Sequence, residues 1–246
     1  MAKDKGAKAK EKKARRKQES EMAQARIAVI KAAYSVDPKV ELAAFDGRFK
    51  KEGMSIKLEW ASAEDMNQDL KAKIRATLEE NMAEVYAEDW PKAKQVKDKE
   101  MVEDDARYLY TWDISDSANP ALAGFIQYRF VIEEEVEVLY IYELQVLNGY
   151  QRKGLGKFII MCMEMLARKA GVKGVMLTCQ KKNKAAYGFY KSIRYTEDAI
   201  SPCNVDPYAP PEDYPYEILS KIFDPEAQLM LEARAQVAKA QYAAEY

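Results

Sequence analysis

The sequence contains no histidine. Catalysis by serine–histidine or cysteine–histidine pairs is therefore excluded, and so are metal sites with histidine ligands. Any general base must be a carboxylate, a tyrosine, a lysine or a water held by such groups. This absence narrows the chemistry more than any other feature of the composition.

Cysteine is scarce, and long apolar runs are missing. The three cysteines, Cys162, Cys179 and Cys203, are widely spaced, which fits a reducing compartment and neither a disulfide framework nor a metal pattern. No apolar run approaches the roughly 20 residues of a membrane span, and the lysine-rich amino terminus lacks the apolar stretch of a signal peptide. We therefore expect a soluble, intracellular protein with no metal and no membrane partner.

Charge is nearly balanced over the whole chain but not along it. A net charge of −1 and an apolar fraction of 48% over 246 residues predict one domain with extensions, neither disordered nor globally basic. Residues 3–17, however, carry nine lysines and arginines against two acids. We expect residues 1–18 to be a solvated, mobile tail, in which the cluster at 12–17 serves nuclear import or contact with nucleic acid.

The order of apolar patterns predicts an α+β domain. Helices are expected at residues 19–34, 62–90, 157–171, 184–193 and 224–246. Strands are expected at residues 54–60, 107–113, 121–132, 136–146, 172–180 and 216–222, and another begins at 194. Ser62 should cap the second helix and Pro91 should end it, leaving a polar connector. The predicted divisions are a basic tail (1–18), a helical extension (19–53), the sheet domain (54–223) and a terminal helix (224–246).

A glycine-containing turn, QRKGLGK at 151–157, stands between a predicted strand and a predicted helix. Backbone N–H groups of such a turn and the helix amino terminus attract anions, and glycine lets a phosphate come close. The spacing matches neither of the two common nucleotide loops. The sequence therefore predicts a phosphate site formed by Gln151, Arg152, Lys153, Gly154, Leu155, Gly156 and Lys157.

Two segments resemble the signatures of the GNAT acetyltransferases. LQVLNGYQRKGLG at 144–156 resembles the Q/R-x-x-G-x-G/A segment with its preceding L-x-V strand end, and NKAAYGFYKSIRY at 183–195 resembles N-x-x-A-x-x-F-Y. The resemblance implies the GNAT acyl-CoA N-acyltransferase fold, a central mixed, mostly antiparallel sheet flanked by helices. It also implies acetyl-CoA as co-substrate and no metal. The implied contacts to the cofactor are Leu144, Gln145, Val146, the 151–157 turn, Asn183 on the pantetheine arm, and Tyr190, which can protonate the departing thiolate.

Other segments resemble the NatD-type N-terminal acetyltransferases. They are KAKEKKARRK (8–17), ENMAEVY (80–86), EVLYIYELQV (137–146), RKGLGKF (152–158), VMLT (175–178) and YEILS (216–220). This resemblance implies acetylation of the α-amine of histone tails that begin Ser-Gly-Arg-Gly-Lys, in the nucleus and cytoplasm. It also implies contact of the basic tail with the nucleosome or ribosome. The resemblance weakens after about Phe223, and it departs at Val131, where family members are acidic.

The reaction needs a base and an oxyanion donor. An α-amine has a pKa near 8, so its deprotonation at neutral pH is uphill by about 1 unit, against about 3 for lysine, and a carboxylate suffices. Glu143 is the best candidate because it directly precedes Leu144, whose backbone N–H would stabilise the oxyanion. Strict alternation separates Tyr142 from Glu143. A bulge, common in this strand of GNAT enzymes, would bring both to one cleft, where Tyr142 could hold a water.

Aromatic and acidic residues are expected to bind the substrate. They are Tyr86, Trp90, Glu133, Tyr140, Tyr142 and Tyr216, with the loop 201–215 as a second wall, and Glu133 would pair with the arginine of the tail. The alternatives are a hydrophobic plug at the helix end for Trp90, core aromatics for Tyr140 and Tyr142, a helix cap for Asn183, and a structural or tail-binding carboxylate for Glu143. Two other functions remain open: a lysine or broader protein acetyltransferase, and an inactive GNAT-fold module that docks basic proteins.

Overall fold

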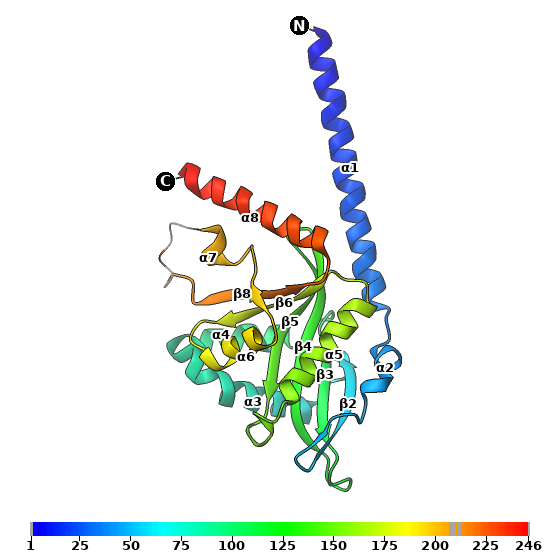
Figure 1. The fold of residues 1–246 in the computed structure, drawn as a ribbon, viewed down its shortest axis with the longest axis vertical. Helices are drawn as coiled ribbons and strands as arrows, with labels where there is room; N and C mark the ends of the chain where they lie inside the picture. The colour runs from blue at the N-terminus through cyan, green and yellow to red at the C-terminus, as the bar shows by residue number, and fades with distance from the viewer. Residues whose placement is uncertain (1, 207–209, 211–212, 246) are drawn as a thin grey trace.

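One sheet forms the centre of the computed structural model, which describes residues 2–206, 210 and 213–245 (Figure 1). Its strands are β1 (Lys50–Lys51), β2 (Met54–Ser62), β3 (Arg107–Asp113), β4 (Ala121–Glu133), β5 (Val136–Val146), β6 (Gly174–Gln180), β7 (Thr196–Glu197) and β8 (Tyr216–Ile222). They lie in the order β1-β2-β3-β4-β5-β6-β8-β7. Every described pair is antiparallel except β5 with β6. The prediction of an α+β fold with a mixed, mostly antiparallel sheet is confirmed.

Helices cover both faces of this sheet. They are α1 (Ala2–Tyr34), α2 (Pro38–Glu41), α3 (Gln68–Tyr86), α4 (Trp90–Glu100), α5 (Leu155–Lys169), α6 (Lys184–Ser192), α7 (Pro202–Val205) and α8 (Pro225–Glu245). The buried face of α5 shares one core cluster with Leu109, and α3 shares another with Tyr108. Because neighbouring residues of a strand point to opposite faces, α5 and α3 lie on opposite sides of the sheet.

The parallel strands β5 and β6 separate part of the way along. They pair only from Leu139–Val175 to Ile141–Leu177, whereas β5 continues to Val146 and β6 to Gln180. The backbone of β5 beyond Ile141 therefore has no strand partner on its β6 side. Unpaired N–H groups on that side are available to a ligand.

Strand β5 also carries the expected bulge. Gln127 of β4 faces Glu143, but the next residue, Tyr128, faces Ile141, so that Tyr142 is the extra residue. A bulge disturbs the alternation of side chains and can bring two successive residues toward the same space. The position of this bulge coincides with the point where β5 and β6 separate.

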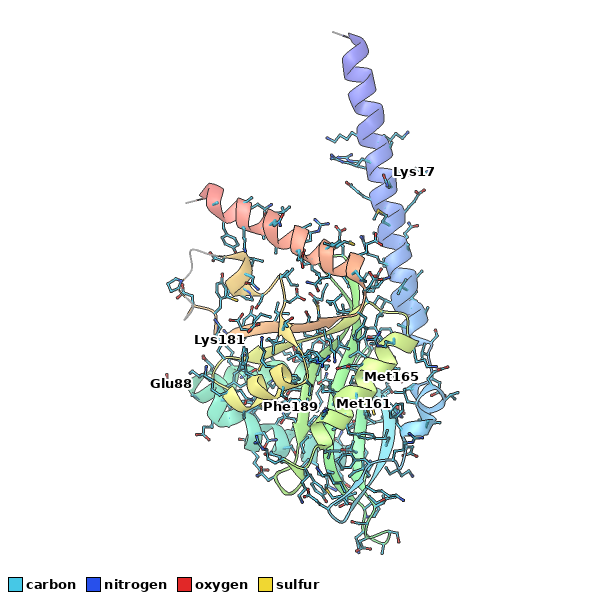
Figure 2. All side chains as sticks on the ribbon, in the orientation of Figure 1. Lys17, Glu88, Met161, Met165, Lys181 and Phe189 are labelled. Carbon is cyan, nitrogen blue, oxygen red and sulfur yellow. The ribbon has the colours of Figure 1, made fainter. Side chains whose placement is uncertain are left out.

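Helix α1 differs from the prediction. The expectation that the helix begins near Glu19 was wrong, because α1 runs from Ala2 and extends away from the rest of the molecule (Figure 1). Alanine, lysine, arginine and glutamate are strong helix formers, and the i,i+4 ion pairs Arg15–Glu19 and Lys17–Glu21 add support. Figure 2 shows Lys17 on the projecting part of the helix.

The segment between β2 and β3 holds two helices where one helix and a connector were expected. Ser62 and Asp65 form a capping box for a short 3-10 turn, and α3 begins only at Gln68. The helix ends at Tyr86, because Ala87 adopts a left-handed φ of +50°. Pro91 does not end a helix but lies in the first turn of α4, where its missing N–H has no intrahelical acceptor to lose.

The terminal helix α8 packs against the sheet. Asp224 caps it as predicted, and its Oδ1 accepts the Ala227 N–H at 3.0 Å. Ala227 and Leu231 are buried with Val138 and Met176. This helix has few apolar positions that are buried, but they are enough to fix its first half on β5 and β6.

Glu135, in the turn between β4 and β5, connects the two terminal helices. Its carboxylate accepts Arg26 of α1 at 3.0 Å and also contacts Arg234 of α8. The terminal helices are thus attached to the sheet domain through its β4–β5 hairpin.

Among the described helices, none has the combination of length and apolar character that crossing a lipid bilayer requires.

Candidate active site

A groove of about 670 Å³ opens where β5 and β6 separate. Its floor is formed by the second half of β5, and α3, α4, β6 and α6 contribute the walls. The described residues that line it include the predicted site residues Tyr86, Glu133, Tyr140, Tyr142, Glu143, Leu144, Gln145, Asn183 and Tyr190. The structure therefore brings most of the predicted catalytic and substrate residues together in one space.

Glu143 lies at the centre of a polar network in this groove. Its side chain is only 6% exposed, and it forms an ion pair with Lys97 of α4. Gln145 donates from Nε2 to Glu143 Oε2 at 3.1 Å and accepts Asn81 Nδ2 of α3 at 2.9 Å. The carboxylate is thus fixed from two sides and remains at the groove surface.

Burial alone would lower the pKa of Lys97, but the nearby Glu143 carboxylate and the Tyr86 hydroxyl raise it above the usual lysine value. The Lys97 ammonium also lies 5.4 Å from the centre of the Tyr86 ring. Lys97 is therefore cationic at physiological pH, in contact with the Glu143 side chain.

The backbone beside Glu143 can supply the expected oxyanion donor. The Leu147 N–H donates to Ala123 O of β4 at 3.0 Å. By alternation along the strand, the N–H groups of Leu144 and Val146 point away from β4, toward the side that β6 has left. Leu144 N–H thus faces the groove directly next to Glu143.

Tyr142 is held by a cation. Arg129 of β4 places its guanidinium 4.2 Å from the centre of the Tyr142 ring. Arg129 also donates to Glu100 O at 2.8 Å and forms ion pairs with Glu103 and Asp105, the second at 3.1 Å. Burial raises the pKa of the Tyr142 hydroxyl, although Arg129 opposes the shift. Tyr142 and Glu143 both line the groove, as the bulge allows.

Tyr190 of α6 lies opposite this strand. It is 7% exposed, and burial, with smaller effects from Cys179 and Glu143, raises its pKa well above the usual tyrosine value. Burial thus keeps the hydroxyl protonated, so that it can donate a hydrogen bond to a departing thiolate. Asn183 caps α6 through Oδ1, which accepts the Ala186 N–H at 3.0 Å, and also lines the groove. The cap and a cofactor contact are therefore compatible.

The turn before α5 has the form expected of a phosphate site. Arg152 and Gly154 adopt left-handed φ values of +61° and +92°, which bend the chain into the helix. The Phe158 N–H is bound to Gly154 O at 3.1 Å, whereas the first N–H groups of α5 have no helical acceptor. Gln151, Arg152 and Lys157 are exposed here. These features fit the pyrophosphate of acetyl-CoA.

The two glycines of the turn differ in their surroundings. A Cβ at Gly156 would lie in ordinary van der Waals contact with the ring of Phe189 at 3.4 Å and with Val146 Cγ2 at 3.9 Å. A Cβ at Gly154 would approach Lys51 Nζ at 3.9 Å, and the positive φ of Gly154 is a conformation that favours glycine. The approach of a phosphate to both glycines stays a prediction.

A charge reversal tests the turn. Lys157→Glu should weaken acetyl-CoA binding by roughly 10-fold or more, since a charged hydrogen bond contributes about 1.5–3 kcal/mol. Lys157 is exposed, so the fold should be unchanged. Calorimetric titration measures the affinity, and Lys12→Glu on the projecting part of α1 is the matched control. Equal affinity in both variants would contradict the assignment.

Two further predicted substrate residues, Tyr140 and Glu133, also line the groove. Burial raises the pKa of Tyr140 to about 12, and its hydroxyl lies 2.6 Å from Thr178 Oγ1. Burial and the neighbouring acids Glu134 and Asp198 raise the pKa of Glu133. No residue in the described part of the chain forms an ion pair with Glu133. It is therefore a half-buried carboxylate without a cation.

Two predicted substrate residues are not among the described residues that line the groove. Trp90 packs 6.1 Å from Tyr86, ring centre to ring centre, in the core cluster of α3. This contact favours the alternative of a helix-end plug. Tyr216 begins β8 opposite Gln180, next to the groove residue Pro215. Residues 207–209 and 211–212 of the predicted loop wall lie outside the described residues.

Sequence reasoning missed Asn81, Lys97 and Arg129. Asn81 and Lys97 lie on helical surfaces whose sequence predicts exposure to solvent, and Lys97 belongs to the segment predicted as a polar connector. Arg129 stands within an apolar strand, and a charged residue in such a run was the available signal. The described residues contain no group of histidine, cysteine and acidic side chains that could hold a metal.

Comparison with known proteins agrees with this geometry. Residues 75–194 match the family model of the Acetyltransferase (GNAT) family. The chain is similar to the PaiA N-acetyltransferase of Thermoplasma acidophilum, solved with coenzyme A, with 20% identity, coverage of 69% of this chain and 100% of that one, and a TM-score of 0.50. It is also similar to NAA60 of Arabidopsis thaliana (15% identity, coverage 68% and 100%, TM-score 0.47). At such identities the structural likeness concerns the fold alone.

The family match covers residues 75–86 of α3, together with α4, β5, β6, α6 and the turn before α5. All of these except the turn contribute residues to the groove. The turn and the groove fit acetyl-CoA, and the matched fold is that of an acetyltransferase. The chain therefore has the GNAT fold of the acyltransferases, and acetyl-CoA fits its turn and groove as co-substrate.

Proposed function

We propose that the enzyme acetylates the N-terminal α-amine of histone tails that begin Ser-Gly-Arg-Gly-Lys. The observation that carries this proposal is the position of Glu143. It is a buried carboxylate at the point where β5 and β6 separate, next to the Leu144 N–H that points into the same groove. This arrangement puts a proton acceptor and an oxyanion donor side by side.

Each group has one task in the proposed reaction. Acetyl-CoA, when bound, supplies a thioester acyl group. Glu143 accepts the proton of the substrate amine, directly or through a water held by Tyr142. Leu144 N–H donates to the acyl oxygen as negative charge develops there. The amine nitrogen bonds to the acyl carbon, the carbon–sulfur bond breaks, and Tyr190 gives its proton to the departing thiolate of coenzyme A.

One acidic residue of the groove supports a basic peptide as substrate. The described lining contains both signs of charge: the acids Asp89, Glu100, Glu133 and Glu143, and the lysines Lys92, Lys97 and Lys182. Glu133 is half buried and has no described cationic partner, so an arginine side chain would supply the missing charge. Val131, where the related family is acidic, packs against the core cluster that includes Ala227 and Leu231 of α8. Position 131 therefore supplies no second carboxylate, and Glu133 would bind the arginine without it.

Partners and location form part of the same proposal. The exposed cations Lys12, Lys13, Arg15, Arg16 and Lys17 lie on the part of α1 that extends away from the sheet domain. A basic helix of this kind suits an acidic surface such as that of a nucleosome or ribosome. We propose that the enzyme works on tails in the nucleus and cytoplasm.

Mass spectrometry tests the proposed function. The enzyme is mixed with acetyl-CoA and a Ser-Gly-Arg-Gly-Lys peptide, and fragmentation locates the added acetyl group. The expected product carries it on the terminal amine. Acetylation of the lysine would support the broader alternative, and acetyl-CoA binding without any acetylation of basic peptides would support an inactive module.

A further inference from the structure

A lysine from α4 enters the active-site groove. The Lys97 side chain is 13% exposed and contacts Glu143, the proposed base, which is 6% exposed. Lys94, one turn earlier on the same helix, instead forms an ion pair with Glu79 at 2.7 Å, and both partners are about half exposed. Two neighbouring lysines of one helix thus have different environments, one at the solvent and one in the groove.

The surroundings of Glu143 contain few other charges. Among the described residues, two polar groups contact it directly: the ammonium of Lys97 and the amide of Gln145. The titratable groups of the elements packed around it are Tyr86 of α3, Glu100 of α4, Tyr108 of β3 and Tyr190 of α6. The charge of Arg129 of β4 favours the ionised forms of Glu100 and Tyr108, and its guanidinium forms ion pairs with Glu103 and Asp105. Lys97 is therefore the cation that balances Glu143.

This balance matters for a base in a groove. A buried carboxylate without a cationic partner favours its protonated form, in which it accepts no proton. A cation in contact keeps the carboxylate ionised down to lower pH. The second contact, from Gln145, is held in turn by Asn81, so one oxygen of Glu143 is fixed by an amide and the other by Lys97.

We infer that Lys97 is a positioning residue for acetyl transfer, which holds the Glu143 carboxylate in its ionised form and aimed into the groove. This inference rests on the proposed role of Glu143. Lys97 acts through Glu143 and needs no contact with the substrate. Its removal should therefore change the pH dependence of the reaction, which loss of a purely structural contact would not do.

The pH profile of kcat/KM for the peptide tests this role. In Lys97→Met the acidic limb of the profile should move to higher pH by about 1 unit or more, because Glu143 loses its cationic partner. At pH values above that limb, Lys97→Met should regain much of the wild-type kcat/KM. Lys97→Arg keeps the charge and should leave the limb near its wild-type position. Lys94→Met is the matched control and should not move it.

Thermal unfolding without acetyl-CoA gives a second, independent readout. In Lys97→Met the folded protein contains a buried carboxylate that resists ionisation, so stability is present at low pH and is lost as the pH rises. The melting temperature should therefore fall further below that of the wild type at pH 8 than at pH 5. The double variant Lys97→Met/Glu143→Gln has no unpaired charge and should recover part of the loss.

The outcomes separate this inference from the proposed function. If Lys97→Met reduces activity equally at every pH and its melting temperature shows no added pH dependence, Lys97 is only a packing residue and the inference fails. If Glu143→Gln retains wild-type turnover, the proposed role of Glu143 as the general base is wrong instead. The inference stands if the limb moves in Lys97→Met and returns in Lys97→Arg.

Discussion

Glutamine in place of Glu143 should slow turnover by roughly 10²-fold or more, the contribution of a positioned general base. The amide keeps the shape of the side chain but accepts no proton from the substrate amine. The loss should shrink as the pH rises above about 8, where the α-amine is already neutral. Steady-state kinetics with the peptide between pH 6 and 9 measure both effects.

Because Glu143 forms an ion pair with Lys97, this experiment needs a control for stability. Glu143→Gln leaves the Lys97 ammonium without its partner inside the groove, so the variant should melt at a lower temperature than the wild type. Turnover is therefore measured well below that temperature. Glu79→Gln removes an exposed carboxylate on α3 and serves as the matched control. Turnover of Glu143→Gln close to the wild type would assign the base to a water held by Tyr142.

The sequence predicted most of the sheet because its strands are local apolar patterns. The runs at 107–113, 136–146 and 216–222 coincide with β3, β5 and β8. The bulge at Tyr142 was expected from the resemblance, and the structure places it where β5 leaves β6. Local pattern and family signature thus sufficed for the floor of the groove.

The walls were harder to predict because they depend on contacts between distant residues. Lys97 reaches Glu143 only because α4 folds back over β5, 46 residues apart in the chain. Nothing in the polar segment 91–106 distinguishes Lys97 from Lys94, although one lies in the groove and the other at the surface. The length of α1 was not predicted for another reason. Its run of charges suggested a solvated tail, although the same residues have a high helix propensity.

The arginine of the tail should contribute to binding through Glu133. Alanine in its place should weaken peptide binding by roughly 1.5–3 kcal/mol, the scale of a charged hydrogen bond. In Glu133→Gln the two peptides should bind more equally, because the carboxylate that distinguishes them is gone. Glu134→Gln, an exposed neighbour on the same hairpin, is the matched control. An unchanged preference in Glu133→Gln would place arginine recognition elsewhere.

Blocking the terminal amine of the Ser-Gly-Arg-Gly-Lys peptide should abolish acetylation, with the lysine of the same peptide left unmodified. The lower pKa of an α-amine gives it only a preference of about 2 units over lysine. The greater selectivity should come from geometry, because Glu133 would hold the arginine at one end of the groove while Glu143 meets the amine at the other. Mass spectrometry of free and blocked peptides, with equal enzyme and acetyl-CoA, measures the difference. Acetylation of the blocked peptide on lysine at a comparable rate would replace the terminal-amine proposal with a lysine acetyltransferase.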